Sequence, residues 1–242
     1  MKKKIILDCD PGHDDAVAIM FAAASEEIEL LGITCVAGNT TLDNACLNAL
    51  KICYLIERTD IKIYRGCDKP IEYSLQTAEH VHGKSGLDYD GEEIKIPENF
   101  KIQNEHAVDF IINQCLNSQE KITICPTGPL TNIAEAILRN PLIIDNIDKI
   151  IFMGGVAKDL GNITPVAEFN IFVDPHAANI VLESNIELIM LGLDVTHKVL
   201  VNNHIIKEIS SIGNKSSIFF KQLMEFYSQF HKKKYDTDSS PL

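Results

Sequence analysis

Apolar runs of strand length alternate with segments of helical period along this chain, and the alternation limits the folds open to it. The runs that we expect to be strands are 4–7, 30–36, 61–64, 122–125, 149–153 and 187–191. The segments that we expect to be helices are 16–24, 42–56, 107–116, 130–138, 175–182 and 216–234. Such a rhythm is typical of parallel sheets with helices on both faces. The sequence therefore predicts an α/β fold, a single domain with a Rossmann-like, open, mostly parallel sheet.

Small or oxygen-bearing residues directly follow several of the expected strands. They are Asp10, Gly38-Asn39, Pro126-Thr127-Gly128, Gly154-Gly155 and Asp194. In open α/β sheets the ligand crevice lies beyond the carboxyl ends of the strands, so we expect the site at that edge of the sheet. The polar stretch 68–103 has no clear helix or strand pattern. Loops of that length often form lids or binding loops.

Composition and charge exclude several classes of protein. The 242 residues carry a net charge of −12, whereas nucleic acids and anionic membranes attract a basic surface. The apolar run after the basic start is only 5–7. A secretory signal needs about 7–15 apolar residues and a membrane span roughly 20. The seven cysteines form no Cys-x-x-Cys pair, so we expect core thiols in a reduced, cytoplasmic protein.

The stretch "LDCDPGHDDA" at 7–16 holds four aspartates, Asp8, Asp10, Asp14 and Asp15. Carboxylates this close repel one another, and either a shared proton or a bound cation reconciles them. One aspartate that caps a helix is ordinary, but capping does not account for four. Hard divalent cations prefer oxygen ligands, and no cluster of histidine and cysteine lies nearby in the sequence. The stretch therefore favours Ca²⁺ or Mg²⁺ over zinc.

A strand followed by Asp-x-Asp also begins the dehalogenase-like phosphatases. Their second aspartate is usually followed by Gly-Thr or a similar pair, whereas Pro-Gly-His-Asp-Asp follows here. None of the strand-end motifs supplies a lysine or arginine for a phosphate, and the acidic cluster would repel one. We therefore favour a neutral polyol substrate, whose hydroxyls can bind a metal.

Seven motifs, in the same order as in the family, are similar to those of the inosine–uridine-preferring nucleoside hydrolases. They are "DCDPGHDDAVAI" (8–19), "GITCVAGNTTLDNA" (32–45), "AEHVHGKSGL" (78–87), "PTGPLTNIA" (126–134), "FMGG" (152–155), "GNITPVAEFNIFVDPHAA" (161–178) and "GLDVTH" (192–197). Enzymes of this family cleave the N-glycosidic bond of ribonucleosides with a calcium-bound water. The resemblance covers nearly the whole chain.

The resemblance implies a role for particular residues of this chain. Asp10 and Asp15 would hold Ca²⁺ together with the carbonyl oxygen of Thr127. Asp10 would also be the general base that takes a proton from the water as it attacks C1′. His82 would contact the base. The residues expected at the ribose are Asp14, Asn39, Met153, Asn162, Glu168 and Asn170. The transition state would resemble an oxocarbenium ion, which an acidic pocket stabilises.

The remaining histidines and the last helix carry weaker signals. His80 and His82 lack the further ligands that a zinc site needs. Tyr227 and His231 lie one turn apart in the last expected helix, which in the family brings side chains towards the leaving base. We expect ordinary surface or helix positions for His13, His106, His176 and His204.

The resemblance also implies parts that this sequence does not show. In the family a Pro-Leu-like pair is followed by a His-Asp motif, whose aspartate completes the calcium site and whose histidine often protonates a leaving purine. This sequence ends at "YDTDSSPL", so we expect residues 1–242 to be a nucleoside hydrolase domain without its C-terminal segment. The alternative is an inactive, truncated remnant that binds calcium or ribose without turnover. By resemblance we also expect a homodimer or homotetramer that serves purine and pyrimidine salvage.

Overall fold

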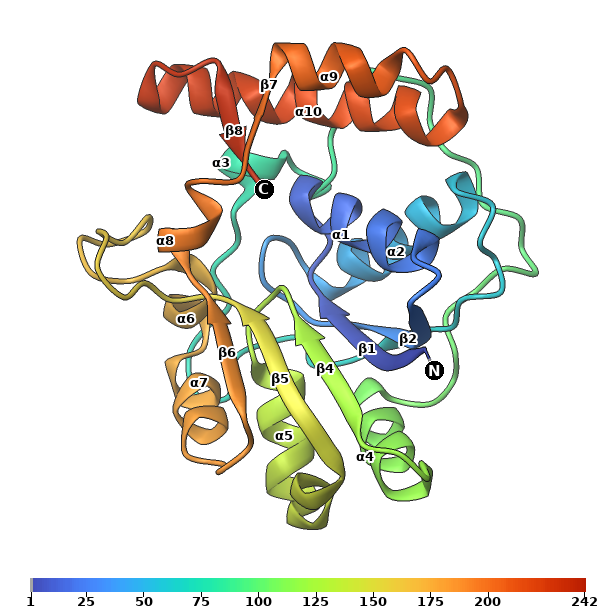
Figure 1. Cartoon of the computed structure of the whole chain (residues 1–242), viewed down its shortest axis with the longest axis vertical. Helices are drawn as coiled ribbons and strands as arrows, with labels where there is room; N and C mark the ends of the chain where they lie inside the picture. The colour runs from blue at the N-terminus through green and yellow to red at the C-terminus, as the bar shows by residue number, and fades with distance from the viewer. Residues whose placement is uncertain (1) are drawn as a thin grey trace.

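A six-stranded sheet runs through the centre of the computed structural model, which describes residues 2–242 (Figure 1). Its strands are β1 (Lys3–Cys9), β2 (Ile28–Cys35), β3 (Ile63–Arg65), β4 (Ile122–Pro126), β5 (Ile147–Met153) and β6 (Leu188–Leu191). All neighbours pair in parallel, in the order β3-β2-β1-β4-β5-β6. The strand order reverses between β1 and β4, which is where ligands bind in sheets of this kind. The predicted α/β fold is confirmed.

Helices cover both faces of the sheet, and an apolar core lies under each layer. The first layer comprises α1 (His13–Ala24) and α2 (Leu42–Leu55); α10 (Lys215–Tyr235) packs against α1, and α9 (Asn203–Ser210) packs against α10. The second comprises α4 (Ala107–Asn117), α5 (Thr131–Arg139) and α7 (Pro175–Leu182). The remaining helices are short: α3 (Glu79–His82), η1 (Pro141–Asn146), α6 (Phe169–Val173) and α8 (Leu193–Thr196).

The last part of the chain turns back over the carboxyl ends of the strands. There α9 and α10 lie across the top of the sheet in Figure 1. A second, antiparallel sheet joins β7 (Leu200–Asn202) to β8 (Ser239–Pro241). The backbone N–H of Leu242 then donates to the carbonyl of Val199 at 3.0 Å. This return path ends beside the segment that follows α8.

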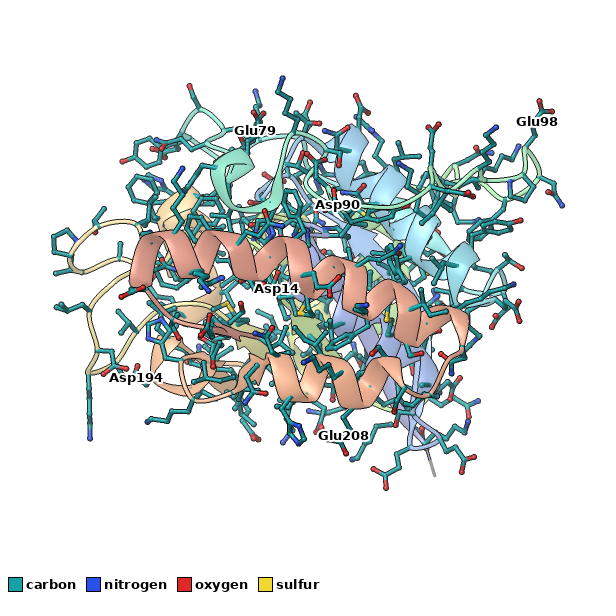
Figure 2. The ribbon with its side chains drawn as sticks, turned by 90° about the horizontal axis from the view of Figure 1, so that it is seen from above. Asp14, Glu79, Asp90, Glu98, Asp194 and Glu208 are labelled. Carbon is teal, nitrogen blue, oxygen red and sulfur yellow. The ribbon has the colours of Figure 1, made fainter. Side chains whose placement is uncertain are left out.

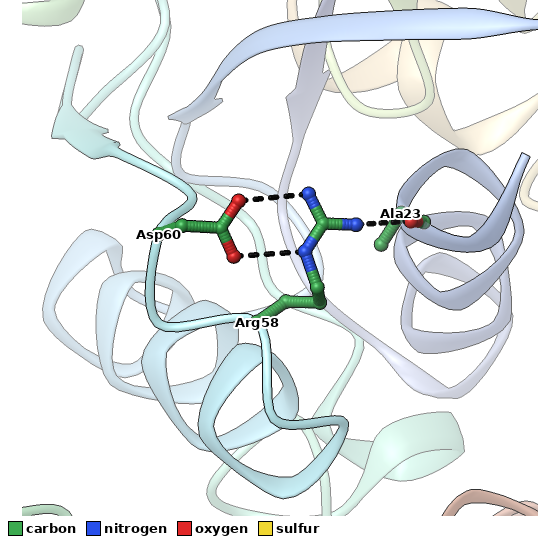
Figure 3. A network of polar contacts seen from close by, with 3 residues as sticks. All are labelled: Ala23, Arg58 and Asp60. Atoms are coloured by element: carbon green, nitrogen blue, oxygen red, sulfur yellow. Dashed lines mark hydrogen bonds and ion pairs between the residues drawn. The ribbon is translucent and has the colours of Figure 1, made fainter. Parts of the chain in front are cut away.

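Arg58 fastens the end of α2 to its surroundings (Figure 3). Its guanidinium donates to both carboxylate oxygens of Asp60, at 2.8 and 2.9 Å, and to the carbonyl of Ala23 at the end of α1. A bidentate arginine–carboxylate pair fixes the relative orientation of its two side chains better than a lysine–carboxylate pair does. The turn that leads into β3 is thereby held against the end of α1.

β6 closes one side of the sheet as an edge strand, paired only with β5 among the described strands. Its apolar side chains Ile189, Met190 and Leu191 are 38, 40 and 39% exposed. Side chains from both faces of this strand therefore reach solvent, in contrast to β1, whose last four residues are buried.

The thiols agree with the sequence analysis. All seven cysteines are free, and five of them are buried: Cys9, Cys35, Cys46, Cys53 and Cys115. Burial raises the pKa of Cys53, Cys67 and Cys115 to about 12. These thiols therefore act as small core residues rather than nucleophiles. Across residues 2–242 no helix has the length and apolar character that a bilayer span requires.

Candidate active site

A cavity of about 670 Å³ opens at the carboxyl ends of the strands. That volume lies in the usual range for small-molecule sites. Figure 2, seen from above, shows α10 crossing over the region of Asp14. All the residues predicted to bind substrate line this cavity: Asp14, Asn39, His82, Met153, Asn162, Glu168 and Asn170. Thr127, predicted as a metal ligand, lines it as well.

Asp10 follows β1 directly and is fully buried at the floor of the site, behind Asn39; neither Asp10 nor Asp15 itself lines the cavity. Its Oδ2 accepts the backbone N–H of Asn39 at 2.5 Å, while its Oδ1 has no hydrogen-bond partner in the structure. A Cβ at Gly38 or Gly128 would collide with this carboxylate, so both glycines are needed for the close approach of their backbone. Burial and the charge of Asp15 raise the pKa of Asp10 well above its usual value.

Asp15 lies beside Asp10 in the first turn of α1. Its Oδ2 accepts the backbone N–H of Gly12 at 2.9 Å and the amide of Asn39 at 3.2 Å. Its Oδ1 accepts the hydroxyl of Thr127 at 2.6 Å. Burial, and next the charge of Asp14, raise the pKa of Asp15 to about 7. Asn39 thus donates to both aspartates and joins β2 to the floor of the site.

The residues present fit an oxygen-liking cation. No three His, Cys, Asp or Glu side chains within the described part of the chain are grouped so that they could hold a metal among themselves. The predicted set is different, because it has two carboxylates and one backbone carbonyl. Buried polar atoms in folded proteins nearly always have a partner, yet Oδ1 of Asp10 lacks one. A buried carboxylate oxygen next to a second carboxylate suits Ca²⁺ or Mg²⁺.

Asp14 and Asn170 form the side of the cavity near that floor. Oδ1 of Asp14 is buried and has no hydrogen-bond partner, and burial raises the pKa of this carboxyl. The amide of Asn170 donates to the carbonyls of Thr127 at 2.8 Å and Met153 at 3.1 Å. One side chain therefore fixes the ends of β4 and β5 relative to each other.

Glu168 caps the N-terminus of α6 and is 2% exposed. Its carboxylate accepts backbone N–H groups of Asn170 at 2.9 Å, Gly155 at 2.9 Å and Ile171 at 3.2 Å. Burial nevertheless raises the pKa of this group, since it outweighs the three backbone bonds. Asn162 lies at the exposed rim, where its Oδ1 accepts the backbone N–H of Phe169 at 2.9 Å.

Asp194 does not line the cavity, although it follows the end of β6. The expectation that its strand end contributes a carboxylate to the site is therefore wrong. Its oxygens accept the backbone N–H groups of Ala157, Lys158 and Asp159 at 2.7 to 3.1 Å. These bonds lower the pKa of Asp194. Asp194 thus holds the turn after β5. One residue of that turn, Asp159, lines the cavity.

Aromatic rings also line the cavity. His82, which is 5% exposed, lies there with Tyr227, Phe230 and His231 of α10. Behind them His13 is 0% exposed; it lies on a helix, as expected, but it is not a surface position. Its place inside the Pro-Gly-His-Asp-Asp motif was the signal for a special position. Phe230 was missed because it comes from a helix that no strand-end argument reaches.

Asp8 is separate from the other three aspartates, in contrast to the cluster of four suggested by the sequence. It is fully buried but does not line the cavity. Its Oδ1 accepts the hydroxyl of Thr34 at 2.6 Å and the amide of Asn132 at 2.8 Å, whereas its Oδ2 has no partner. Burial raises the pKa of Asp8 from 3.8 to about 7. Asp8 therefore anchors α5 to β1 and β2 rather than holding a ligand.

We expect Asp8→Asn to make the protein more stable at pH 8 than the unmodified chain. When the pKa of a carboxyl is higher in the folded than in the unfolded state, the protein becomes less stable as the pH rises from the unfolded-state pKa through the folded-state pKa. For Asp8 that window runs from pH 3.8 to about pH 7, and the loss in the free energy of unfolding across it is at most about 4 kcal/mol. Asparagine keeps the acceptor for Thr34 and Asn132. Urea unfolding at pH 5 and pH 8 measures the difference.

The exposed substitution Asp90→Asn serves as the control and should leave the pH dependence unchanged. Equal pH dependence in Asp8→Asn and the unmodified chain would contradict the assignment of a buried, unfavourable charge to Asp8.

Comparisons with known proteins agree with this geometry. Residues 5–242 match the family model described as "Inosine-uridine preferring nucleoside hydrolase". The chain is 42% identical over 241 residues to the pyrimidine-specific ribonucleoside hydrolase RihB of Escherichia coli. The alignment covers 100% of this chain and 75% of that relative.

Two solved structures have the same fold. The plant nucleoside hydrolase PpNRh1 aligns with a TM-score of 0.93 and 32% identity, over 99% of this chain and 75% of that one. The purine-preferring ribonucleoside hydrolase of Gardnerella vaginalis aligns with a TM-score of 0.91 and 35% identity, over 97% and 74%. These relatives are enzymes that hydrolyse ribonucleosides. The match over nearly the whole sequence shows that the chain belongs to the inosine-uridine preferring nucleoside hydrolase family.

Proposed function

We propose that this chain hydrolyses the N-glycosidic bond of ribonucleosides such as inosine or uridine, giving ribose and the free base. The observation that carries the proposal is the mixed lining of the cavity of about 670 Å³. Carboxylates and amides line it together with aromatic rings. A ribonucleoside offers a partner for both, a polyhydroxylated sugar and a flat base.

We propose Ca²⁺ as the cofactor, held by the carboxylates of Asp10 and Asp15 and by the carbonyl oxygen of Thr127. The unpartnered Oδ1 of Asp10 supports this choice, as does the crowding of Asp10 with Asp15. When bound, the ion would lower the pKa of a water molecule and stabilise its conjugate base.

Asp10 is the proposed general base. One oxygen of its carboxylate takes a proton from the attacking water, whose oxygen forms the new bond to C1′. The C1′–N bond breaks at the same time, and its electron pair leaves with the base. Asn39 fixes the other oxygen and so holds the carboxylate in one orientation.

The ribose would be held by the polar residues around that floor. Asp14 offers an unpartnered carboxylate oxygen, and Glu168 has its carboxylate aligned by three backbone N–H groups. Asn39, Asn162 and Asn170 supply amides, and the side chain of Met153 packs beside them. As the glycosidic bond breaks, positive charge grows on the sugar, and fixed carboxylates nearby stabilise it.

The test is hydrolysis by the purified chain with Ca²⁺, using uridine, inosine and p-nitrophenyl riboside. We expect p-nitrophenyl riboside to be cleaved, because its leaving group departs as a stable anion and needs no acid. Cleavage of inosine in addition would show that the chain itself protonates the base. A folded chain that binds ribose or Ca²⁺ but cleaves none of the three would contradict the proposal and support the alternative of binding without turnover.

Two further expectations stay predictions: the homodimer or homotetramer that the resemblance implies, and the cytoplasmic location inferred from the cysteines. The relatives named above differ between pyrimidine and purine nucleosides, so the comparison of uridine with inosine also measures the preference of this chain.

A further inference from the structure

His13 uses both nitrogens of its ring although it is completely buried. It is the first residue of α1, and its Nε2 lies 2.8 Å from the carbonyl oxygen of Asp88. Its Nδ1 lies 3.0 Å from Nδ1 of His82. The three groups form a chain that runs from the 83–88 loop, through α1, to a ring that lines the cavity.

The proton positions follow from what each group can do. A carbonyl oxygen only accepts, so Nε2 of His13 donates to Asp88. One proton must then lie between the two Nδ1 atoms, because two lone pairs facing each other at 3.0 Å would repel. The backbone N–H of His13 also lies 3.3 Å from Nδ1 of His82. Because neutral His13 carries its one proton on Nε2, the shared proton belongs to Nδ1 of His82, and the inner nitrogen of His82 is engaged as a donor.

Packing holds the His82 ring in the same place. A Cβ at Gly12 would collide with Nδ1 and Cε1 of His82, so only glycine allows the ring to approach the start of α1 this closely. The ring stacks on His13 at 5.3 Å between centroids and on Tyr227 at 5.5 Å. His13 stacks in turn on Phe226 of α10 at 5.2 Å.

The carbonyl that orients His13 is itself held by a closed turn. The carboxylate of Asp88 accepts the backbone N–H groups of Lys84 at 3.0 Å and Ser85 at 3.1 Å, and the hydroxyl of Ser85 at 2.5 Å. The backbone N–H of Asp88 donates to the carbonyl of His82 at 3.2 Å. One short loop therefore carries both His82 and the acceptor that fixes its partner.

We propose that His13 is a positioning residue for the hydrolysis: it occupies the inner nitrogen of His82 and so fixes Nε2 as the nitrogen that meets the nucleobase. The inference rests on the proposed function, since it requires a base at this end of the cavity. Among the described residues no hydrogen bond reaches Nε2 of His82, whose Nδ1 makes both contacts. A ring that was free to flip would present carbon or nitrogen to the base in turn.

The kinetic test uses His13→Leu, which fills similar space without polar atoms, and His13→Gln, which can still bridge Asp88 and His82. Loss of one oriented hydrogen bond should lower kcat for a cleaved nucleoside about tenfold in His13→Leu, with KM nearly unchanged. The rate with p-nitrophenyl riboside should change less than about twofold, since its leaving group needs no such contact. His13→Gln should recover part of the loss.

His82→Ala supplies the double-mutant cycle. If His13 acts through His82, adding His13→Leu to His82→Ala costs nothing further. The exposed His204→Leu is the matched control for losing a histidine. Additive losses in the double variant, or an equal loss for p-nitrophenyl riboside and the nucleoside, would overturn the proposal.

Nitrogen-15 shifts of the His82 imidazole give a readout that needs no turnover. We expect one tautomer in the unmodified chain and a mixture in His13→Leu. A mixture already present in the unmodified chain would overturn the inference about His13. Absence of cleavage with every riboside would instead contradict the proposed function, and the two failures are therefore distinguishable.

Discussion

Asp10→Asn should lower kcat for riboside hydrolysis by about 10³-fold without lowering the melting temperature of the calcium-free protein. The loss in rate is expected because asparagine cannot take a proton from water, and a positioned base typically contributes 10²–10⁴-fold. Stability should hold because the amide oxygen can still accept the backbone N–H of Asn39. Removing a buried charge beside Asp15 also relieves the repulsion that raises the pKa of Asp10. Single-turnover kinetics and thermal unfolding measure the two effects.

Asp145→Asn is a suitable control, since Asp145 is exposed in η1, away from the cavity. An Asp10→Asn variant with an unchanged rate would exclude Asp10 as the base. A variant with a lower melting temperature and a proportional loss of rate would point to a structural role instead.

Removal of calcium should have a comparably large effect on activity, and it should also change stability. Chelation takes away the ion that activates water, so we expect the rate to fall by at least about 10³-fold and to return when Ca²⁺ is added. A ligand present at a hundred times its dissociation constant stabilises the folded state by about 2.7 kcal/mol, so the melting temperature should rise with Ca²⁺.

Asp15→Asn tests whether the ion occupies the proposed place. This variant should lose most of the rise in melting temperature with Ca²⁺, whereas the exposed Asp90→Asn should keep it. Full activity in excess chelator, or an equal rise in melting temperature for both variants, would contradict the assignment of Ca²⁺ to Asp10 and Asp15.

The regular part of the fold could be predicted because each long element carries its own pattern. Residues 42–56 repeat apolar side chains with helical period, and α2 occupies Leu42–Leu55. The short elements carry no such pattern. The helix α8 spans only Leu193–Thr196, which is about one helical turn and too short to show a repeat. β8 reads Ser-Ser-Pro and becomes a strand only because β7 lies beside it. Pairing between distant segments leaves no local trace in a sequence.

The site divides in the same way. Residues that directly follow strands, such as Asn39 and Thr127, could be placed because parallel strands end at one edge of the sheet. A position directly after a strand did not predict the place of Asp194, because its carboxylate accepts backbone N–H groups of residues 157–159 instead of facing the cavity. Phe230 reaches the cavity from α10, whose position depends on packing against α1. The burial of His13 depends on that packing too, since Phe226 and Tyr227 cover its ring.

The open side of β6 has a consequence for how molecules of this protein meet. A strand whose outer backbone groups are unpaired is a template on which another chain can add a strand. Charged side chains commonly guard such strands, but β6 presents Ile189, Met190 and Leu191. Self-association through strand addition at β6 would therefore grow with concentration, and a lysine at position 189 would act as a gatekeeper against it.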